Sequence, residues 1–505
     1  MYFYNEQFFY LIVSFIFTIS SICVHFFFQK EKLSLKLLLL SAVFIGLFSI
    51  TLDPFLNEWD EQFHALVAKN LINNPVKPIL LNDSLVDIPF RNWENNTIWL
   101  HKQPFFLWLM ALSIKIFGIN SFAVRFPSLC FFVIDVLVIY KLAKALEFKN
   151  NHVAFLAALI FSHAYFFIEL MNGFYATDHN DFIFFSLVTL SIYYFILNTK
   201  AKSFKNIFFI GLFTGFALLT KWLPGFLVFL IWMLYALFNK RLKIEFKNMA
   251  FSLIISLLVF LPWQIYTYIN FTDEFINSYL HASNHFFIPL DGHDGDWLFH
   301  VNHLKTIYLN NDLIFYLVVF SLLILPKSIY KWPIIGTVIF VYLFFSISQT
   351  KMIGFTTIVS PFIFISLANF FSRLVKMINF KTTILYVLVC ITISVFFMDL
   401  NHIENNHTFK KPNENYNRKG KLIEYYFTKQ LQENINHKKI ILLNMPHFSH
   451  IQTRFLTNII AYNFIPDASV LIKLKKLGYR LIIIKQKEDL KIKDCIVVNW
   501  PSEVI

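Results

Sequence analysis

Long apolar segments recur along most of this chain, and they restrict its fold more than any other feature. Each has about the length that a helix needs to cross a lipid bilayer. The predicted spans are 8–28, 35–52, 121–140, 152–171, 180–197, 206–221, 223–239, 249–270, 312–326, 332–348, 353–372 and 382–399. Apolar residues make up 57% of the chain, a content typical of membrane proteins. We therefore predict an all-α polytopic membrane protein with about 12 transmembrane helices.

Basic residues give the predicted bundle an orientation. They gather in alternate connections, which face the cytoplasm in membrane proteins. These connections carry Lys30, Lys32 and Lys36; Lys141, Lys144 and Lys149; Lys200, Lys202 and Lys205; Lys240, Arg241, Lys243 and Lys247; Lys327 and Lys331; and Arg373, Lys376 and Lys381. Residues 53–120 and 271–311 and the tail from 400 then lie outside. The same loops explain the net charge of +13, so we expect the lipid bilayer, and no nucleic acid, as a partner.

One further apolar run, residues 104–118, is better read as a helix lying in the membrane interface. It is short, begins at Pro104 and contains Lys115. If it crossed the membrane, most later basic loops would fall outside, against the charge rule. We therefore place an interfacial helix in the first outer loop.

The tail differs from the rest of the chain, because it is polar and rich in lysine. Residues 438–444, 479–486 and 494–500 have the pattern of strands, and 469–478 that of a helix ended by Gly478. We predict two domains: a transmembrane domain over 1–399 and a small extracytoplasmic α/β domain over 400–505.

Two adjacent carboxylates, Asp60 and Glu61, follow the second span and begin an apolar helical pattern. Acidic groups at the edge of a membrane bundle are costly unless they have a task. Asp60 is the candidate for a general base, and His64 falls one helical turn further on. The plain alternative for Asp60 is a solvated loop carboxylate.

Further charges mark the other predicted outer connections. Lys102 precedes the interfacial helix, and either Asp178 or Asp181 serves a function or caps the start of a span. Lys221 and Lys351 lie in short outer turns, where positive charge runs against the sign rule. We interpret these lysines as candidates for binding a phosphate, with snorkelling at the interface as the alternative.

The long outer loop over 271–311 is rich in histidine and aspartate. No spacing in it is diagnostic of a metal site, and a solvated loop is the better interpretation. We expect no required cofactor and leave a divalent metal open.

The ordered set of motifs resembles glycosyltransferase family 39 of the GT-C class, which includes protein O-mannosyltransferases and the aminoarabinose transferase of lipid A. The segments that carry the resemblance are WDEQFHALVAKNL, HKQPFFLWLMALSIKIFGINSFAVRFPS, ATDHNDFIFF, LTKWLPG, LPWQIYTYINFTDEFINSYL and SISQTK. They cover roughly residues 45–370. The chain departs from the family at Phe355 and Thr356, where a tyrosine is usual, and at Trp222, where glycine is usual.

The resemblance implies roles for individual residues. Asp60 matches the catalytic acidic residue of the first outer loop, with Glu61 as its partner. Either Asp178 or Asp181 matches the aspartate of the second outer loop. Lys351 matches the lysine that approaches the carrier phosphate. Lys102 matches the lysine before the loop helix, and Arg125 the arginine of an R-x-P-S turn.

The function we predict is a membrane glycosyltransferase that uses a polyprenyl-phosphate sugar. The acceptor, a lipid, glycan or protein, attacks the anomeric carbon with inversion, on the outer face of a bacterial inner membrane. Asp60 takes the acceptor proton while Lys351 and Lys102 stabilise the leaving phosphate. Two alternatives are a flippase or ligase of lipid-linked glycans and a non-enzymatic membrane scaffold.

Overall fold

The computed structural model describes residues 5–57, 59–83, 85, 86, 94, 96–148, 150–175, 178–378, 381–407, 416–434, 439–446, 448–485 and 495–500. The chain divides into two compact units. We call Tyr4–Ile50 with Ser128–Ile403 the bundle unit, and Thr51–Pro127 with Glu404–Ile505 the loop–tail unit. One division falls inside helix α5 (Ser121–Ala145), after Pro127.

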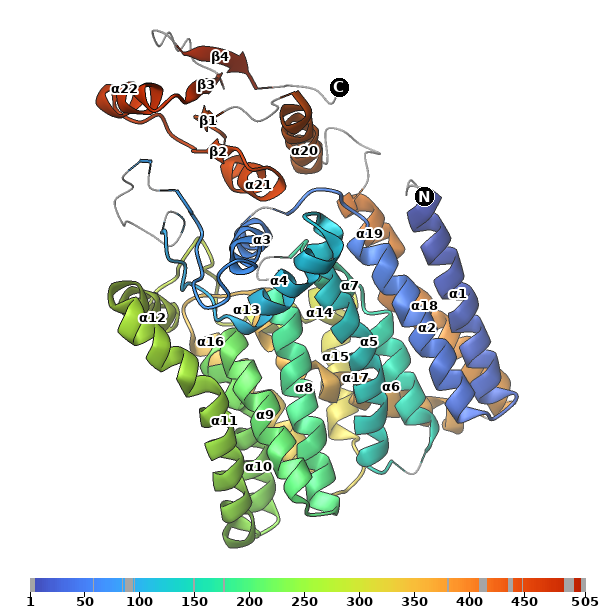
Figure 1. Ribbon diagram of the computed structural model, residues 1–505. Coiled ribbons are helices and arrows are strands. Elements are labelled where there is room, and N and C mark those ends of the chain that lie inside the picture. The colour runs from blue at the N-terminus through green and yellow to red at the C-terminus, as the bar shows by residue number, and fades with distance from the viewer. Residues whose placement is uncertain are drawn as a thin grey trace. The chain divides into compact units, whose positions relative to one another are not determined.

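The bundle unit is built of helices (Figure 1). After α5, its long helices are α1 (Asn5–Phe26), α2 (Glu31–Ile50), α6 (His152–Ser162), α8 (Asp178–Lys200), α9 (Phe204–Lys221), α10 (Leu227–Phe238), α11 (Leu242–Asn270), α12 (Thr272–Phe287), α15 (Leu313–Leu323), α16 (Lys331–Ile347), α17 (Ser360–Met377) and α18 (Thr382–Met398). Shorter elements are α7 (Tyr165–Met171), η1 (Leu223–Phe226), α13 (Phe299–Asn302), α14 (Leu304–Tyr308), η2 (Ile353–Val359) and α19 (Leu400–His407), which continues into the other unit.

Every one of the predicted spans coincides with helix, but the helices do not all have the predicted length. Within the described residues, eight are long and apolar enough to cross a membrane, or ten if each of two bent pairs forms one span. Leu223–Phe238 and Lys331–Ile347 are shorter apolar helices. At 1.5 Å per residue they reach about 24–26 Å, less than a hydrocarbon core of about 30 Å. Eight to ten of the predicted spans meet this measure among the described residues, and the all-α multi-pass fold class is confirmed.

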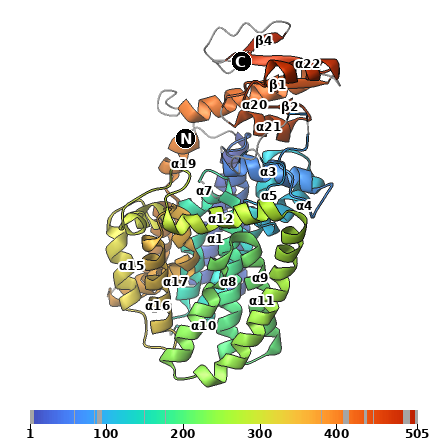
Figure 2. The ribbon, with the colours of Figure 1, turned by 90° about the vertical axis from the view of Figure 1, so that its left-hand side faces the viewer.

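Small and polar side chains hold the bundle together. A Cβ at Gly211 of α9 would lie 2.5 Å from the Ser252 carbonyl oxygen of α11, and one at Gly215 would lie 2.6 Å from Val259 Cβ. Glycine thus lets the backbones of α9 and α11 approach closely along their length (Figure 2). Because apolar side chains gain little from contact with each other in lipid, such close packing is a main source of helix association.

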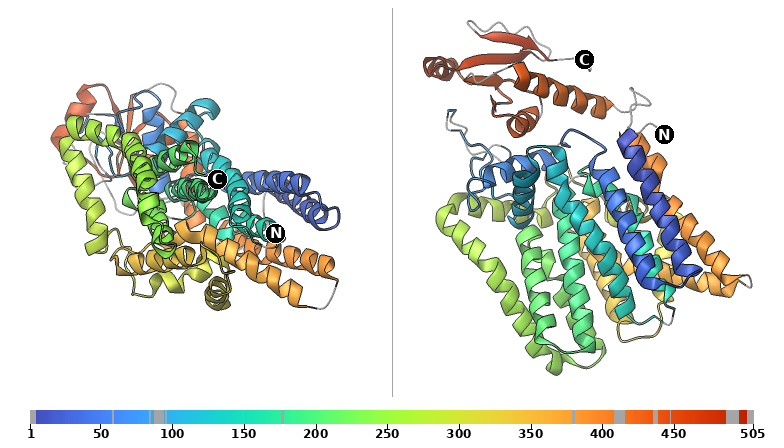
Figure 3. Two further views of the ribbon diagram at one scale, coloured as in Figure 1. Left: turned by 90° about the horizontal axis from the view of Figure 1, so that it is seen from below. Right: turned by 45° about the vertical axis from the view of Figure 1, so that its right-hand side comes forward.

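Two features of the bundle unit concern how its helices are arranged. α1 and α2 form an antiparallel pair (Figure 3), joined in part by a hydrogen bond of 2.6 Å between the hydroxyls of Thr18 and Ser41. α12 lies across the direction of α11 and has no buried residue, as expected of an amphipathic helix at an interface (Figures 1 and 2).

The loop–tail unit holds the first outer loop together with the tail. Its helices are α3 (Asp60–Leu71), α4 (Phe105–Phe117), α20 (Tyr416–Asn434), α21 (Ser449–Leu456) and α22 (Ala468–Lys476). α4 corresponds to the predicted interfacial helix. With 13 residues it is about 20 Å long, too short to cross a bilayer.

The tail folds as the predicted α/β structure. Strands β1 (Ile440–Leu443), β2 (Ile460–Ala461), β3 (Arg480–Lys485) and β4 (Ile496–Asn499) form a parallel sheet in the order β2-β1-β3-β4. Ile441 is aligned with Leu481, and Ile483 with Val497. The helix that ends near Gly478 is also present, and Gly478 has the positive φ of 83° that glycine tolerates best. Helices α20 and α21 and strand β2 were not predicted.

The core of this sheet includes a residue of the first outer loop. Val86 is buried in a cluster with Ile441, Leu443, Ile483 and Tyr462. The compact units thus group residues 51–127 with the tail, whereas the sequence suggested a single division at residue 400.

Candidate active site

Helix α3 begins where the sequence places its two carboxylates. Trp59 has a φ of 66°, which is not a helical conformation, so the helix cannot start before Asp60. Asp60 is therefore the first helical residue and Glu61 the second. Negative side chains in the first turn interact favourably with the positive end of the helix dipole. The two neighbours nevertheless lie in different surroundings.

Glu61 is fully enclosed in a buried ion pair with Arg125 of α5. Arg125 donates from Nε to Glu61 Oε1 at 2.7 Å and from Nη2 to Oε2 at 3.0 Å, and neither side chain is exposed. The backbone N–H of Asn57 donates to Oε2 at 2.6 Å, while Arg125 also binds the carbonyls of Asp53 and Phe55 at 2.6 and 2.7 Å. These contacts make Glu61 and Arg125 positioning residues for the segment before α3. A catalytic role for Glu61 remains only a prediction.

Asp60 keeps part of its surface accessible and pairs with a predicted partner. Lys102 Nζ lies 3.3 Å from Asp60 Oδ2, and the two side chains are 17% and 12% exposed. Burial alone would raise the pKa of Asp60, but the positive charges of Lys102, His64 and His101 outweigh burial and hold this pKa below its usual range. Asp60 is therefore an ionised carboxylate at neutral pH, next to a cation, as the sequence predicted.

His64 lies one turn after Asp60 but is packed rather than exposed. Its ring is fully buried and meets the ring of Phe106 at 4.8 Å and that of Trp99 at 5.8 Å, both edge to face. These contacts join α3 to the chain around α4. A substrate-binding role for His64 stays a prediction.

The tail fixes the segment that leads into α3. Asp53 accepts a hydrogen bond from His407 Nδ1 at 2.7 Å and one from Arg418 Nε at 2.9 Å. Leu56 N donates to Gln452 Oε1 of α21 at 2.9 Å. Burial alone would raise the pKa of Asp53, but His407, Arg418 and Arg125 outweigh burial and lower it. Sequence reasoning missed this set of residues, because no local pattern links side chains that lie more than 350 positions apart.

A second group of tail contacts holds α3 itself. Lys69 Nζ donates to the carbonyls of Arg454, Phe455 and Thr457 at 2.7 to 2.8 Å, at the C-terminal end of α21. These carbonyls lack partners within their own helix, so the ammonium group satisfies them. At the other end of α3, the ring of Phe63 meets that of Phe448 at 5.3 Å.

In the bundle unit, the start of α8 and the end of α9 form the second candidate pair. Asp181 makes an ion pair with Lys221, and both side chains are largely buried. The Lys221 ammonium also lies 4.6 Å from the centre of the Phe355 ring. Asp178 begins α8, but its side chain lies outside the described part of the structure. The choice between the two aspartates therefore remains open.

Lys351 is held differently from Lys102 and Lys221. Its Nζ donates to the carbonyls of Phe345 and Ser346 at 3.1 and 2.7 Å and to that of Ser348, and only 4% of the residue is exposed. Burial lowers its pKa, and the Asp296 carboxylate opposes this shift. In this conformation Lys351 caps the C-terminal end of α16. Its predicted contact with a phosphate requires the ammonium to leave these carbonyls.

The histidine-rich loop over 271–311 forms no evident metal centre. Among the residues that the structure describes, no three histidine, cysteine, aspartate or glutamate side chains are close enough together to hold an ion. His281 Nε2 lies 3.5 Å from Asp291 Oδ2, and Lys351 N donates to the His293 carbonyl at 2.9 Å. The loop is thus joined to the turn that carries Lys351.

Of the predicted site residues, Asp60, Glu61, His64 and Lys102 come together in the loop–tail unit, while Asp181 and Lys221 come together in the bundle unit.

We compared the chain with known protein families, relatives and solved structures. Residues 101–266, about a third of the chain, match the family model described as dolichyl-phosphate-mannose-protein mannosyltransferase.

Several relatives and solved structures are similar to the chain over longer stretches. An uncharacterised protein of Aquifex aeolicus is 27% identical over 352 residues, which cover 67% of this chain and 65% of that protein. An undecaprenyl phosphate-α-4-amino-4-deoxy-L-arabinose arabinosyl transferase of Pseudomonas fluorescens is 26% identical over 221 residues, 42% of this chain and 39% of the relative. The match thus spans less than two thirds of the length of either relative.

The crystal structures of ArnT from Cupriavidus metallidurans share the fold. The form bound to undecaprenyl phosphate has a TM-score of 0.63 at 13% identity and covers 86% of both chains. The apo form has a TM-score of 0.62 and covers 86% of this chain and 90% of that one. The chain therefore has the fold of the GT-C class of membrane glycosyltransferases. Within that class it resembles the aminoarabinose transferases and the protein mannosyltransferases, which confirms the resemblance drawn from the motifs.

Proposed function

We propose that this protein is a membrane glycosyltransferase that moves a sugar from a polyprenyl-phosphate carrier to an acceptor. The observation that carries the proposal is the Asp60–Lys102 pair, an ionised carboxylate 3.3 Å from an ammonium group at the start of a helix. A relative and the matching family model carry names that refer to undecaprenyl phosphate and dolichyl phosphate. Both carriers are polyprenyl phosphates, so the carrier class is the feature they share.

The reaction is a displacement at the anomeric carbon of the donor. The acceptor atom forms a bond to this carbon as its bond to the phosphate oxygen breaks, and the polyprenyl phosphate leaves with the electron pair. The cation of Lys102 stabilises charge that develops on the phosphate, as do Lys221 and Lys351 if they reach it. Attack from the face opposite the leaving group inverts the anomeric centre.

In this scheme Asp60 binds and orients the acceptor. If the attacking atom of the acceptor carries a proton, Asp60 accepts this proton. Its lowered pKa keeps it ionised but also makes it a weak base. The acceptor is a lipid, a glycan or a protein.

The site faces the outside of a bacterial inner membrane in this proposal. Support comes from the basic residues of alternate loops, which place residues 53–120 on the extracytoplasmic side. Single cysteines at positions 90 and 410 should react with a membrane-impermeant maleimide in intact cells, while one at 203 should not. Labelling at 203 from outside would reverse the orientation.

The direct test is release of the carrier. Purified protein in nanodiscs receives polyprenyl-phosphate sugars and candidate acceptors, and free polyprenyl phosphate is measured by mass spectrometry. Turnover that is lost in Asp60→Asn identifies a transferase. Transbilayer movement of a fluorescent carrier without release of phosphate would instead identify a flippase. If the protein shows neither activity, the non-enzymatic scaffold is the remaining alternative.

A further inference from the structure

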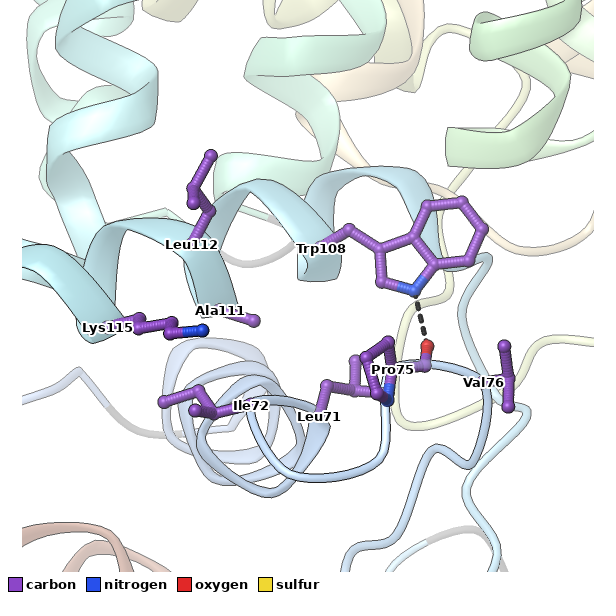
Figure 4. A pocket seen from close by; sticks show the side chains of 8 residues that line it. All are labelled: Leu71, Ile72, Pro75, Val76, Trp108, Ala111, Leu112 and Lys115. Carbon is purple, nitrogen blue, oxygen red and sulfur yellow. Dashed lines mark hydrogen bonds between the residues drawn. The ribbon is translucent and has the colours of Figure 1, made fainter.

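A pocket lies between the C-terminal end of α3 and the face of α4, away from the candidate active site. Its volume is about 280 Å³, and its lining is apolar except for Lys115. Leu71 and Pro75 form one wall, and Ala111 and Leu112 of α4 form the other (Figure 4). The Trp108 indole N–H donates to the Pro75 carbonyl at 2.7 Å and fixes one end.

The pocket is separate from the reacting groups. Asp60 is the first residue of α3 and Leu71 the last, so the helix places them about 16 Å apart. Lys102, the partner of Asp60, precedes α4, whereas Lys115 lies in its last turn. The phosphate of a sugar donor is bonded directly to the reacting carbon, so a phosphate at Lys115 is too far from Asp60 to belong to the donor.

The surface around the pocket suits a lipid chain. Leu112 and Ile116 of α4 are 56% and 64% exposed, and Val76 opposite them is exposed too. Such an apolar surface on a helix too short to span a membrane is typical of a segment that lies in the interface. Lys115 supplies a cation at the rim, where an ammonium group reaches the level of lipid phosphates while its alkyl stem stays in the apolar layer.

We propose that this pocket binds one acyl chain of an anionic phospholipid, whose headgroup phosphate pairs with Lys115. The lipid anchors α4 to the outer leaflet. Since Lys102 directly precedes α4 and contacts Asp60, the same lipid steadies the ion pair of the candidate active site. This site is independent of the proposed transferase activity, because it rests on the shape, the apolar lining and the single charge of the pocket.

The test uses the full-length protein in detergent and native mass spectrometry. Phosphatidylglycerol and phosphatidylcholine with the same acyl chains are titrated separately. We expect one phosphatidylglycerol to bind at least tenfold more tightly than phosphatidylcholine, and Lys115→Gln to remove this preference. Lys473→Gln, which removes an exposed lysine of α22, is the matched control and should leave the preference intact.

A second measurement locates the lipid without relying on the charge. Phosphatidylglycerol with a photoreactive acyl chain should cross-link to peptides that contain Trp108 or Leu112, and Ala111→Trp, which fills the pocket, should abolish this product. If Ala111→Trp does not fold, Leu112→Asp serves the same purpose. Cross-links elsewhere in the chain would overturn the proposal. Competition for the cross-link by polyprenyl phosphate but not by phosphatidylglycerol would assign the pocket to a carrier chain. Protection from cross-linking by glycerol phosphate alone would show that no acyl chain is bound. Either result contradicts the proposal.

Discussion

Lys102 of the loop–tail unit and Lys351 of the bundle unit are held in different ways. In the loop–tail unit, Lys102 and Asp60 face each other at 3.3 Å with part of each side chain exposed. In the bundle unit, Lys351 is almost fully enclosed, and its ammonium group is bound by carbonyls at the end of α16. The first arrangement leaves surface for a substrate to contact. The second satisfies the cation internally, so a substrate must compete with the protein for it.

The same contrast exists between two adjacent residues of the loop–tail unit. Glu61 is buried and bound at both oxygens by Arg125, whereas Asp60, one position earlier, keeps 12% of its side chain exposed beside Lys102. Charged groups whose hydrogen bonds are all made within the protein contribute mainly to structure. Those that keep some exposed surface are better able to contact a substrate. Variants at these positions test that distinction.

The largest effect on stability is expected at Glu61. Glu61→Gln removes the carboxylate that pairs with the buried Arg125 guanidinium, and breaking a buried pair typically costs about 3–5 kcal/mol. We expect a strongly lowered midpoint of thermal unfolding in detergent. Asp60→Asn is the comparison variant, and its midpoint should fall less, because the Lys102 ammonium left behind keeps some contact with solvent. Equal midpoints for the two variants would remove the contrast between these neighbours.

The largest effect on catalysis is expected at Asp60. Asp60→Asn keeps the size of the side chain but removes its charge and its capacity to accept a proton, so turnover should fall by roughly two orders of magnitude or more. Carrier binding should change little. Steady-state turnover is measured on protein that elutes as a single species in gel filtration. Near-normal turnover would exclude Asp60 from the mechanism.

A smaller effect is expected at Lys351. If the residue leaves its carbonyls to bind the donor phosphate, Lys351→Ala loses one charge-assisted hydrogen bond and the apparent KM for the donor rises by about tenfold, with acceptor affinity largely unchanged. Lys351→Arg should retain part of the activity, because the charge survives while its geometry changes. Kinetics with donor and acceptor varied separately decide the matter. A lowered melting temperature without any change in donor KM would leave Lys351 as a helix cap only.

The smallest effect is a dependence of stability on pH at Asp53. The pKa of Asp53 in the folded protein lies below the unfolded value of about 3.9. The ionised Asp53 therefore contributes fully to the free energy of unfolding above about pH 4, and this contribution is lost as the pH falls through the folded pKa. The difference in melting temperature between the natural protein and Asp53→Asn should therefore be larger at pH 7 than at pH 3. A difference that does not change over this range would mean that the ion pairs with His407 and Arg418 do not set the protonation of Asp53.

Much of the fold is predictable because its signals are local. Each long apolar run predicts a helix, and the charge rule separates α4 from the true spans through Lys115 and its neighbours. The strands β1, β3 and β4 are recognisable from short runs of isoleucine and valine. In contrast, α20 and α21 are polar and do not resemble the long apolar runs that predict the other helices, and both were missed.

The site was predictable only in part, for a related reason. Asp60 and Lys102 stand out because each is a charge beside an apolar segment. The sequence gives no means of telling Asp60 from Glu61, since the difference depends on Arg125, 64 positions away. The same holds for Lys351, whose carbonyl partners depend on how the chain turns after α16. Contacts of this kind are set by tertiary packing rather than by residue type or spacing.

The place of Val86 in the core of the tail has a consequence for biosynthesis. The segment around Asp60 leaves the ribosome early, but Val86, Asp53 and Leu56 find their partners among residues 407–483, near the other end of the chain. Contacts across such separations form late, because a long loop must close first. The first outer loop therefore waits through the synthesis of some 300 residues before it reaches its final structure.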